Sequence, residues 1–404
     1  MSWPKLKLES LAAKEPYSFV GGPFGSKLTT RDYVESGIPV IRGSNMNNGR
    51  YLDMTDFVFV TESKVREDLS SNLAKPGDLV FTQRGTLGQV AIIPSDGIAD
   101  RYVVSQSQMK LTVDEDKADR LFLYYFFSSR EATERIMSFV SSSGVPHINL
   151  TVLRNFEVPV PPPENQRNIA RVLSTYDDLI ENNRRRIQLL EQAARLLYKE
   201  WFVHLRFPGH EHTPIIDGVP EGWEKKPLSE IADITMGQSP KSIFYNKDGN
   251  GLPFHQGVTN FGVRFPSHET YCTVQSRIGE PGDILFSVRA PVGRINITPD
   301  KIVIGRGLAA IRSNCDLQNY LFYALKSHFF KEDMIGGGAI FAAITKKDLH
   351  GVELMQPTDR IAAMFMEHVL PIDLQIANLQ QTIEKLAKAR DLLLPKLMNG
   401  EVAV

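Results

Sequence analysis

The sequence predicts an α+β fold in which two mixed α/β domains alternate with two long helices that form an antiparallel coiled coil. Two observations lead to this prediction. A set of short elements occurs twice, in the same order, along the 404 residues. Each half then ends in a long segment whose apolar residues are spaced alternately three and four apart, which is the pattern of a pairing helix. The two halves would be related by an internal pseudo-two-fold axis.

The longest repeated element is KPGDLVFTQRGTLGQV, at residues 75–90, which recurs as EPGDILFSVRAPVGRI at residues 280–295. Pro, Gly, Asp, Phe, Arg and Gly recur in register. Two more elements match: SWPKLKLESLA with GWEKKPLSEIA, and GIPVIRG with GLPFHQG. The offset falls from 220 at Trp3 and Trp223 to 205 in the longest match. Deletions in the loops of the second copy would produce this drift, because loops tolerate changes of length.

The apolar seam of the first helix runs from Leu173 to Trp201, and each of its positions has a counterpart 196 residues later, from Val369 to Leu397. This a/d pattern is sustained for about four heptads. The proline-rich run PVPPPENQ ends where Glu164 would begin the first helix, and MQPTDR places Thr358 at the expected N-cap of the second. Helices of about 36 to 40 residues would be roughly 55 to 60 Å long.

Each helix alone would expose an apolar stripe, and the nearest matching stripe is on the other helix. Burial of each seam Ile or Leu contributes roughly 1.5–3 kcal/mol. An antiparallel pair agrees with the duplication of a two-fold dimer, whereas a parallel pair would crowd both domains at one end. Asn183 either sets the register of pairing or lies at a hydrated layer. The residues expected to pair the helices are Ile180, Asn183, Ile187, Leu190, Leu197, Ile376, Leu379, Ile383, Leu386 and Leu393.

The order of these elements divides the chain into four segments. The expected boundaries are 1–163 for the first domain, 164–206 for the first helix, 207–356 for the second domain and 357–404 for the second helix. Within the first domain, the β-branched and aromatic runs VIRG, FVFV, DLVFTQ and VAIIP predict strands. Residues 118–139 predict a helical stretch.

The balance of charge limits the kind of nucleic-acid binding that the chain could support. Its 46 Lys and Arg residues are offset by 47 Asp and Glu residues, giving a net charge of −1. A protein that binds mainly through phosphates normally has a basic excess. A nucleic-acid role would therefore rest on local clusters or on a partner subunit.

Cysteine content and hydropathy indicate the compartment. Cys272 and Cys315 are too few and too far apart for a disulfide framework or a zinc cluster, which favours the reducing cytoplasm. The N-terminal residues lack the apolar run of a signal peptide. The longest apolar run, Leu121 to Phe127, is far shorter than the roughly 20 residues that span a bilayer. We expect a cytoplasmic protein without a membrane segment.

Motifs of catalytic chemistry are missing from the sequence. GGPFGSK, at residues 21–27, lacks the G-K-[ST] ending of a phosphate-binding loop, and no G-x-S-x-G or His/Cys cluster occurs. His147, His204, His255 and the pair in residues 210–212 are isolated, as surface or core histidines are. We therefore expect no catalytic residue, no metal and no cofactor in this chain.

Polar side chains gather in loops that follow the predicted strands. Asn, Gln and Arg make bidentate contacts with adenine and guanine edges in the major groove, although they are also common in turns. Arg84 and Arg289 share one turn position, which favours phosphate or structural contacts, whereas their differing neighbours would read bases. The candidate DNA-binding residues are Lys27, Arg42, Asn45, Asn47, Gln83, Arg84, Thr86, Gln89, Lys241, Gln256, Asn260, Arg264, Arg289 and Arg294.

Together these features resemble the specificity subunit of type I restriction–modification systems. The resemblance rests on Trp3 and Trp223 at the start of each half, the repeated PGD strand, the PVPPPENQ run into a long helix, and the domain–helix–domain–helix order. It covers essentially the whole chain. The second half departs from the pattern, because MQPTDR lacks the proline-rich run and its Glu-Gln.

The resemblance implies two target-recognition domains, each reading one half of a bipartite, asymmetric site in double-stranded DNA. The paired helices would separate them and dock two adenine methyltransferase subunits, and restriction (translocase–nuclease) subunits would join this core. S-adenosylmethionine would be bound by the methyltransferase, which flips and methylates an adenine in each half. A coiled-coil scaffold for protein partners, with no direct reading of DNA, is the alternative. A self-sufficient nuclease or methyltransferase is disfavoured by the missing motifs.

Overall fold

The computed structural model describes residues 3–46, 49–140, 146–329 and 343–404. These form two compact units. Unit 1 comprises Met1–Arg184 and Gln381–Val404, and unit 2 comprises Arg185–Gln380. The boundary between the units therefore falls within both of the long helices.

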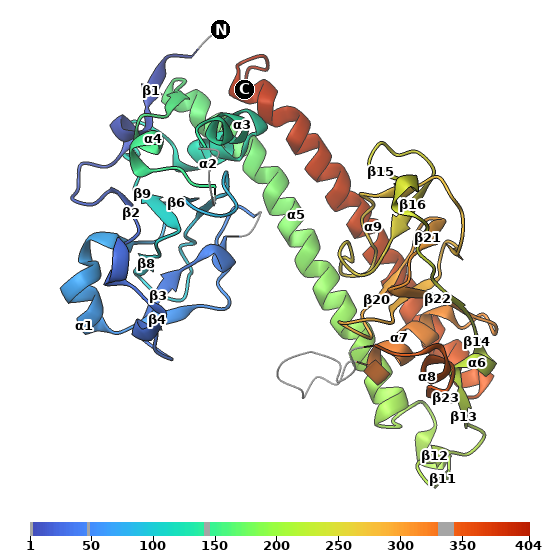
Figure 1. The fold of residues 1–404 in the computed structure, drawn as a ribbon. Coiled ribbons are helices and arrows are strands. Elements are labelled where there is room, and N and C mark those ends of the chain that lie inside the picture. Colours follow the sequence, from blue (N-terminus) through green and yellow to red (C-terminus); the bar gives the residue numbers. More distant parts are fainter. Residues whose placement is uncertain (1–2, 47–48, 141–145, 330–342) are drawn as a thin grey trace. The chain divides into compact units, whose positions relative to one another are not determined.

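Unit 1 contains two four-stranded sheets and one two-stranded ribbon (Figure 1). In spatial order, the first sheet consists of β2 (Phe19–Gly21), β9 (Gln108–Leu111), β6 (Leu79–Thr82) and β7 (Val90–Ile92). The second consists of β4 (Val58–Val60), β3 (Ile38–Ile41), β8 (Tyr102–Val104) and β5 (Leu73–Ala74). The ribbon pairs β1 (Lys5–Lys7) with β10 (Glu157–Pro159).

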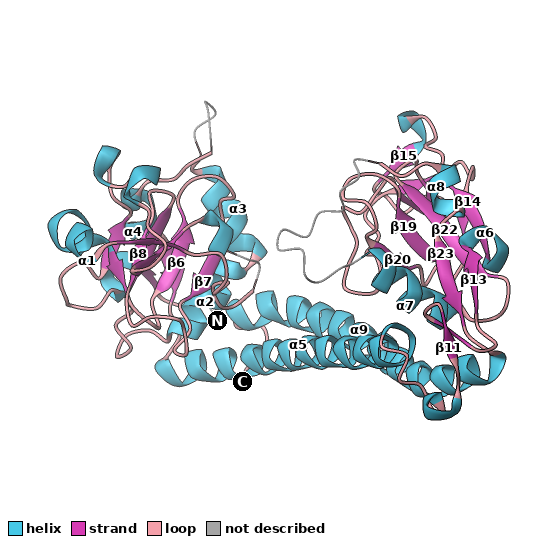
Figure 2. Ribbon diagram, turned by 90° about the horizontal axis from the view of Figure 1, so that it is seen from below, coloured by secondary structure: helices cyan, strands magenta, loops and turns pink. Residues whose placement is uncertain are grey.

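Unit 2 repeats this plan with an extra edge strand (Figure 2). Its first sheet consists of β14 (Ala232–Met236), β22 (Leu308–Ser313), β19 (Ile284–Ser287) and β20 (Ile295–Ile297). Its second consists of β15 (Tyr245–Asn246), β17 (Tyr271–Cys272), β16 (Leu252–His255), β21 (Ile302–Ile304) and β18 (Ile278–Gly279). Two ribbons pair β13 (Glu224–Pro227) with β23 (Glu353–Gln356), and β11 (Ile215–Ile216) with β12 (Val219–Pro220).

Strand order and register confirm the internal repeat. Leu79 lies opposite Leu111 in unit 1, and Ile284 lies opposite Ile311 at the same place in unit 2. In each unit the central pair of the second sheet is parallel, β3 with β8 and β16 with β21, whereas every pairing in the first sheet is antiparallel. The four runs that predicted strands in the first half overlap β3, β4, β6 and β7.

The Pro-Gly-Asp element is a turn that leads into the central strand of the first sheet. The backbone N–H of Asp78 donates to the carbonyl of Lys75 at 3.0 Å, and Gly77 between them has a φ of 90°. Pro76 at the second position and a glycine of positive φ at the third are typical of a type II turn. Glu280–Asp283 forms the same turn, with its glycine at a φ of 89°. Turn geometry therefore explains why this element occurs twice.

Short helices cover the sheets of each unit. Those of unit 1 are α1 (Glu62–Lys64), α2 (Arg120–Ser128), α3 (Arg130–Ser138) and α4 (Leu150–Arg154). Those of unit 2 are α6 (Leu228–Ile231), α7 (Gln318–Phe329) and α8 (Lys346–His350). The helical stretch predicted for residues 118–139 is two helices, because Ser129 leaves the helical conformation and accepts a hydrogen bond from the backbone N–H of Ala132.

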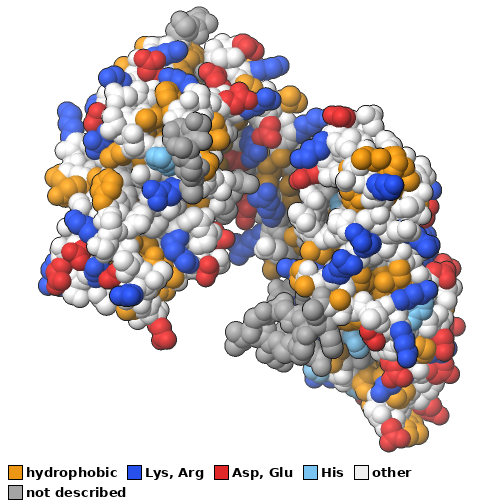
Figure 3. Space-filling model, in the orientation of Figure 1, with side chains coloured by type: hydrophobic (Ala, Val, Ile, Leu, Met, Phe, Trp, Pro, Cys, Tyr) orange, Lys and Arg blue, Asp and Glu red, His pale blue; other side chains and the backbone are white. Residues whose placement is uncertain are grey.

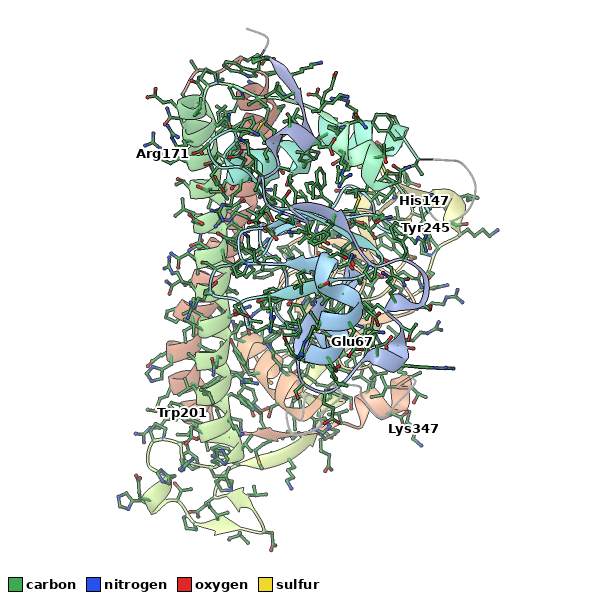
Figure 4. The ribbon with its side chains drawn as sticks, turned by 90° about the vertical axis from the view of Figure 1, so that its left-hand side faces the viewer. Glu67, His147, Arg171, Trp201, Tyr245 and Lys347 are labelled. Atoms are coloured by element: carbon green, nitrogen blue, oxygen red, sulfur yellow. The ribbon has the colours of Figure 1, made fainter. Side chains whose placement is uncertain are left out.

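The two long helices are α5 (Pro163–Tyr198), of 36 residues, and α9 (Asp359–Met398), of 40 residues. The first begins at Pro163, one residue before the predicted Glu164, and the second begins directly after Thr358, the predicted N-cap. A π-helical turn, Lys199–Val203, continues α5 and carries Trp201 (Figure 4).

Within unit 1 the two helices run antiparallel. The side chain of Asn168, near the start of α5, donates to the backbone carbonyl of Val404, beyond the end of α9, at 3.4 Å. Further along α5, Asp177 pairs with Arg390 at 2.6 Å, so the residue number rises on one helix as it falls on the other.

Within unit 2 the direction is the same. The ring centroids of Tyr198 and Phe365 lie 5.9 Å apart. Seven residues earlier on α5, Glu191 shares the guanidinium of Arg264 with Asp373, which lies eight residues later on α9. The predicted antiparallel coiled coil is thereby confirmed. Of the predicted seam residues, Ile180, Asn183, Ile187, Ile376, Leu379 and Ile383 are buried, and Leu190, Leu197, Leu386 and Leu393 are half-buried.

Candidate nucleic-acid interface

The polar loops of unit 1 meet at one edge of its sheets. The backbone N–H of Gly22, after β2, donates to Gln108 at 2.9 Å, and that of Gln83, after β6, donates to Ser107 at 2.7 Å. The N–H of Ser105, after β8, donates to Ile41 at the end of β3 at 3.0 Å. We call residues 22–28, 42–46, 83–89 and 105–107 the loop edge of unit 1.

Most of the residues predicted to bind DNA in the first half lie on this edge. Lys27, Arg84 and Thr86 are exposed. Arg42, Gln83 and Gln89 are half-buried. The guanidinium of Arg42 donates to the carbonyl of Asp56 at 2.8 Å. The amide of Gln89 donates to the carbonyl of Met46 at 3.1 Å, which ties two of the loops together.

Arg84 sits where the loop edge is fastened to the segment after α3. Its backbone forms a bridge with His147, a residue labelled in Figure 4. On either side, Gly85 donates to Pro146 at 3.2 Å and Ile148 donates to Gln83 at 3.0 Å. The equivalent Arg289 forms a backbone bridge with Ala343. Both arginine side chains are exposed, so their backbones brace the turn while their charges face solvent.

The structure corrects the prediction that Asn45 binds DNA. Its side chain is 0% exposed. Its carbonyl oxygen accepts from the N–H of Arg42 at 2.9 Å, and its amide donates to the carbonyls of Asp53 at 3.2 Å and Thr55 at 2.9 Å. These bonds hold the loop in shape and leave no amide donor for a base, so the prediction for Asn45 is wrong. Asn47 lies outside the described residues.

Unit 2 presents an equivalent edge. Gly237, after β14, donates to Leu308 at 2.9 Å, while Gly307 donates to Gln256 at 3.1 Å and accepts from Val288 at 2.9 Å. We call residues 237–242, 256–260, 288–294 and 305–307 the loop edge of unit 2. On this edge Lys241, Gln256, Arg289 and Arg294 are exposed, and Asn260 is half-buried.

The structure also corrects the prediction that Arg264 binds DNA, because the guanidinium of Arg264 points into the protein. Its side chain is 2% exposed and donates to Glu191 of α5 at 2.6 Å. It also pairs with Asp373 of α9 at 3.0 Å and donates to the hydroxyl of Tyr323 of α7 at 2.7 Å. A base could not reach it without breaking these contacts, so Arg264 is a structural residue and not a DNA-binding one.

Sequence reasoning missed Arg306, at the tip of the turn between β21 and β22. Its side chain is exposed, and Gly305 and Gly307 on either side press against Gln256. A Cβ on either glycine would come within 2.8 Å of that residue's backbone, so the two glycines let the turn pack closely. The equivalent tip of unit 1 is Gln106, whose amide donates to the carbonyls of Gly25 and Leu28. A Gly-Arg-Gly run between apolar strands was the available signal.

On the face shown in Figure 3, Lys and Arg side chains are interspersed with Asp and Glu side chains. This agrees with the net charge of −1. Among the described residues, no group of three or more His, Cys, Asp or Glu side chains is placed to hold a metal ion.

Each long helix carries leucines that point away from its seam. They are exposed, and the described part of the chain leaves them uncovered. These leucines are Leu179, Leu189, Leu196, Leu370, Leu374 and Leu392. In the same described part of the chain, no helix is both long and apolar enough to cross a bilayer.

The type I restriction modification DNA specificity domain matches the chain twice, at residues 24–192 and 220–387. Together the two matches cover most of the sequence. The chain belongs to this family. It is a DNA specificity subunit of a type I restriction–modification system, and the repeated match coincides with the repeat of the sequence. The specificity subunit recognises DNA and is not the catalytic part of such a complex.

The sequences of two relatives align with nearly the full length of this specificity subunit. A Methanocaldococcus jannaschii protein named as the specificity subunit of the type I restriction enzyme MjaX is 32% identical over 91% of this chain and 88% of its own. The MjaIX specificity subunit of the same organism is 27% identical over 93% and 89%. The crystal structure of a type I S subunit from M. genitalium is 17% identical and covers 98% of this chain and 96% of its own, with a TM-score of 0.55, which supports the fold.

Proposed function

We propose that each loop edge of this specificity subunit reads one half of a bipartite, asymmetric site in double-stranded DNA. The observation that carries this proposal is that one backbone frame, present twice, displays different side chains. The turn tip holds Gln106 in one copy and Arg306 in the other, and the arginine turn is followed by Thr86 in one copy and Pro291 in the other. A shared frame with unlike side chains is what two unlike half-sites require.

The proposed DNA-contacting residues, which are those predicted from the sequence together with Arg306, fall into two groups by their exposure and charge. Lys27, Lys241, Arg84 and Arg289 are suited to phosphate contacts, because they are exposed cations and the two arginines share one position. The proposed base readers are Arg42, Gln83, Thr86, Gln89, Gln256, Asn260, Arg294 and Arg306. A few bidentate contacts of roughly 1–3 kcal/mol each would reach the ~4–10 kcal/mol that separates specific from non-specific binding.

We further propose that the helices dock two adenine methyltransferase subunits, and that restriction (translocase–nuclease) subunits join this core. The exposed leucines of α5 and α9 support a protein partner there, because apolar side chains left uncovered on helices are typical of interfaces. S-adenosylmethionine would be bound by the methyltransferase in the cytoplasm. A partner that contributes the phosphate clamp would also explain how a chain of net charge −1 binds DNA.

The functional segments that we propose are residues 1–163 and 207–356 as reading domains, and 164–206 and 357–404 as the spacer helices. DNA repeats its major groove about every 34 Å. Helices of 36 and 40 residues, at 1.5 Å per residue, exceed that distance.

Methylome sequencing of a host tests the proposal directly. Deletion of this chain should abolish one bipartite adenine-methylation motif, and a motif that persists would contradict the proposal. Gel shift with the partner methyltransferase separates it from the alternative, a coiled-coil scaffold, because a scaffold would give a complex without sequence-specific retardation. Among the proposed DNA-contacting residues, Arg306→Ala should reduce the discrimination between bases at one position of the site. Lys241→Ala should weaken binding to all DNA sequences alike and reduce the salt dependence of the binding affinity.

A further inference from the structure

Each unit fastens its loop edge to a long helix through the same three kinds of side chain. In unit 2, Tyr323 of α7 donates to Asp373 of α9 at 2.7 Å and accepts from Arg264 at 2.7 Å. Arg264 also pairs with Asp373 at 3.0 Å and with Glu191 at 2.6 Å, and its guanidinium lies 4.2 Å from the ring centre of Phe322. We call Arg264, Tyr323 and Asp373 the anchor of unit 2.

Unit 1 contains the same arrangement on its own helices. Tyr125 of α2 donates to Asp177 of α5 at 2.7 Å. Arg50 pairs with the next residue, Asp178, and Arg390 of α9 pairs with Asp177 at 2.6 Å. Burial lowers the pKa of Arg50, but the hydrogen bond to Asp178, and then the nearby Tyr51 and Tyr125, outweigh burial and raise the pKa. Arg50, Tyr125 and the Asp177–Asp178 pair are the anchor of unit 1.

The two anchors occupy equivalent positions in the repeat. Arg50 ends the element GSNMNNGR and Arg264 ends its counterpart GVTNFGVR. Asp177 and Asp373 are separated by 196 residues, the offset of the two helix seams. Tyr125 and Tyr323 belong to α2 and α7, the apolar helices that follow the first sheet in each unit. The tyrosine–aspartate bond recurs at the repeat offset and belongs to the shared frame. The arginine pairs with the counterpart of Asp177 in unit 2 and with the adjacent Asp178 in unit 1.

The backbone of each anchor arginine is tied to the strand that leaves the reading turn. The carbonyl of Arg50 accepts from the N–H of Ile92 in β7 at 2.9 Å. The carbonyl of Arg264 accepts from the N–H of Ile297 in β20 at 2.8 Å. These strands follow residues 83–89 and 288–294 of the loop edges. One residue thus joins the reading turn, through its backbone, to the long helix, through its side chain.

The hydrogen bonds of each anchor persist over a wide range of pH, because its tyrosine stays protonated. Burial raises the pKa of Tyr323, and the carboxylate of Asp373 raises it further while Arg264 opposes the change, so the phenol keeps its proton and donates. Burial and then Asp177 raise the pKa of Tyr125 in the same way. A planar guanidinium held by several acceptors also fixes the orientation of the arginine side chain. The compact ammonium of a lysine would not do this.

We propose that the two anchors set the angle of each loop edge to its own helix, and thereby determine how strictly the specificity subunit enforces the spacer between the half-sites. This rests on the proposed function, because a spacer exists only for a bipartite site. The anchor residues are positioning residues and do not contact DNA themselves. Loosening an anchor should let its loop edge tilt, so that a half-site displaced by one base pair becomes acceptable.

The test uses the complete methyltransferase complex and synthetic duplexes that carry the native spacer or a spacer one base pair shorter or longer. The measured quantity is the rate of adenine methylation in each duplex. With wild-type protein a misplaced half-site should be methylated about 100-fold more slowly, as misalignments of about 1 Å and more can cause. Arg264→Gln and Arg50→Gln, tested singly, should reduce this preference about tenfold, with base preference inside each half-site unchanged.

A structural role alone would slow methylation by the same factor on all three duplexes and so leave the spacer preference unchanged. That result would overturn the proposal. Lys301→Gln is the matched control, since Lys301 forms an exposed ion pair with Glu280 in the same unit and should leave the preference unaltered. If Arg264→Gln does not assemble, Tyr323→Phe removes the two hydrogen bonds of the hydroxyl but leaves Arg264 and Asp373 paired, and it should give a smaller change in the same direction. A wild-type complex indifferent to the spacer would refute the proposed function itself, and the anchor proposal with it.

Discussion

The buried arginine of unit 2 offers a sharp energetic prediction. Replacing Arg264 with Met keeps most of the side-chain volume but removes the charge that Glu191 and Asp373 share. Removing one partner of a buried ion pair typically costs about 3–5 kcal/mol, because the other charge is left without compensation. Glu191 retains Lys326 at 2.9 Å, and Asp373 retains Tyr323 at 2.7 Å. We therefore expect a loss at the low end of the range, about 3 kcal/mol.

The equivalent change in unit 1 should cost less. The Asp178 side chain that pairs with Arg50 is 63% exposed, so water can solvate it once the arginine is gone. Arg50→Met should therefore cost about 1 kcal/mol, the value of an ordinary hydrogen bond or exposed pair. Lys301→Met, at an exposed pair, should cost less than about 1 kcal/mol.

Urea unfolding followed by tryptophan fluorescence measures these losses, and the uncharged denaturant leaves ion pairs unscreened. For Arg50→Met the protein keeps Trp3, which is the tryptophan of unit 1. In a Trp3→Phe background the remaining tryptophans, Trp201 and Trp223, both report on unit 2. The free energy of unfolding follows from linear extrapolation. Equal losses for Arg264→Met and Lys301→Met would refute the reasoning, because burial would then have no effect on the cost.

Three further predictions concern stability. Burial, then the charge of His268, lowers the pKa of His255 to about 4. As pH falls from 6.5 toward 4 the unfolded chain binds this proton first, so unit 2 should lose about 3 kcal/mol of stability, and His255→Gln should lack this loss in urea titrations at each pH. Ile187→Ala, at a residue 3% exposed, should cost about 2–5 kcal/mol by the same titration. Gly282→Ala should cost about 1–2 kcal/mol from its positive φ, and Gly77→Ala about the same, because the atom nearest its Cβ belongs to the flexible guanidinium end of Arg120; a melting temperature equal to that of the wild type for either variant would contradict this.

Much of the fold could be predicted from the sequence because it repeats. The repeated PGD element anticipates that β6 and β19 are equivalent strands, and the heptads anticipate α5 and α9. The antiparallel direction followed from symmetry alone. The break at Ser129 was missed because no glycine or proline marks it, and its cap only becomes evident from the bond to Ala132.

The candidate interface was less predictable. Polar residue type indicates which side chains could read bases, but it does not reveal which are buried. Asn45 is buried and bonded within its own loop, to Arg42, Asp53 and Thr55. Arg264 is buried against Glu191, Tyr323 and Asp373, which folding brings from distant helices. A signal did exist for the anchor: an arginine kept at one register in both halves, together with aspartates separated by the helix offset. Such identity between copies marks the shared frame, whereas we propose that readers lie where the copies differ, as at Arg306.

The central claim is that one chain holds two independent, unlike reading heads. Exchange of residues 1–163 with those of a relative, followed by methylome sequencing, tests it most directly. One half of the methylated motif should change, while the other half and the spacer stay as they were. A motif altered in both halves, or in neither, would contradict the account.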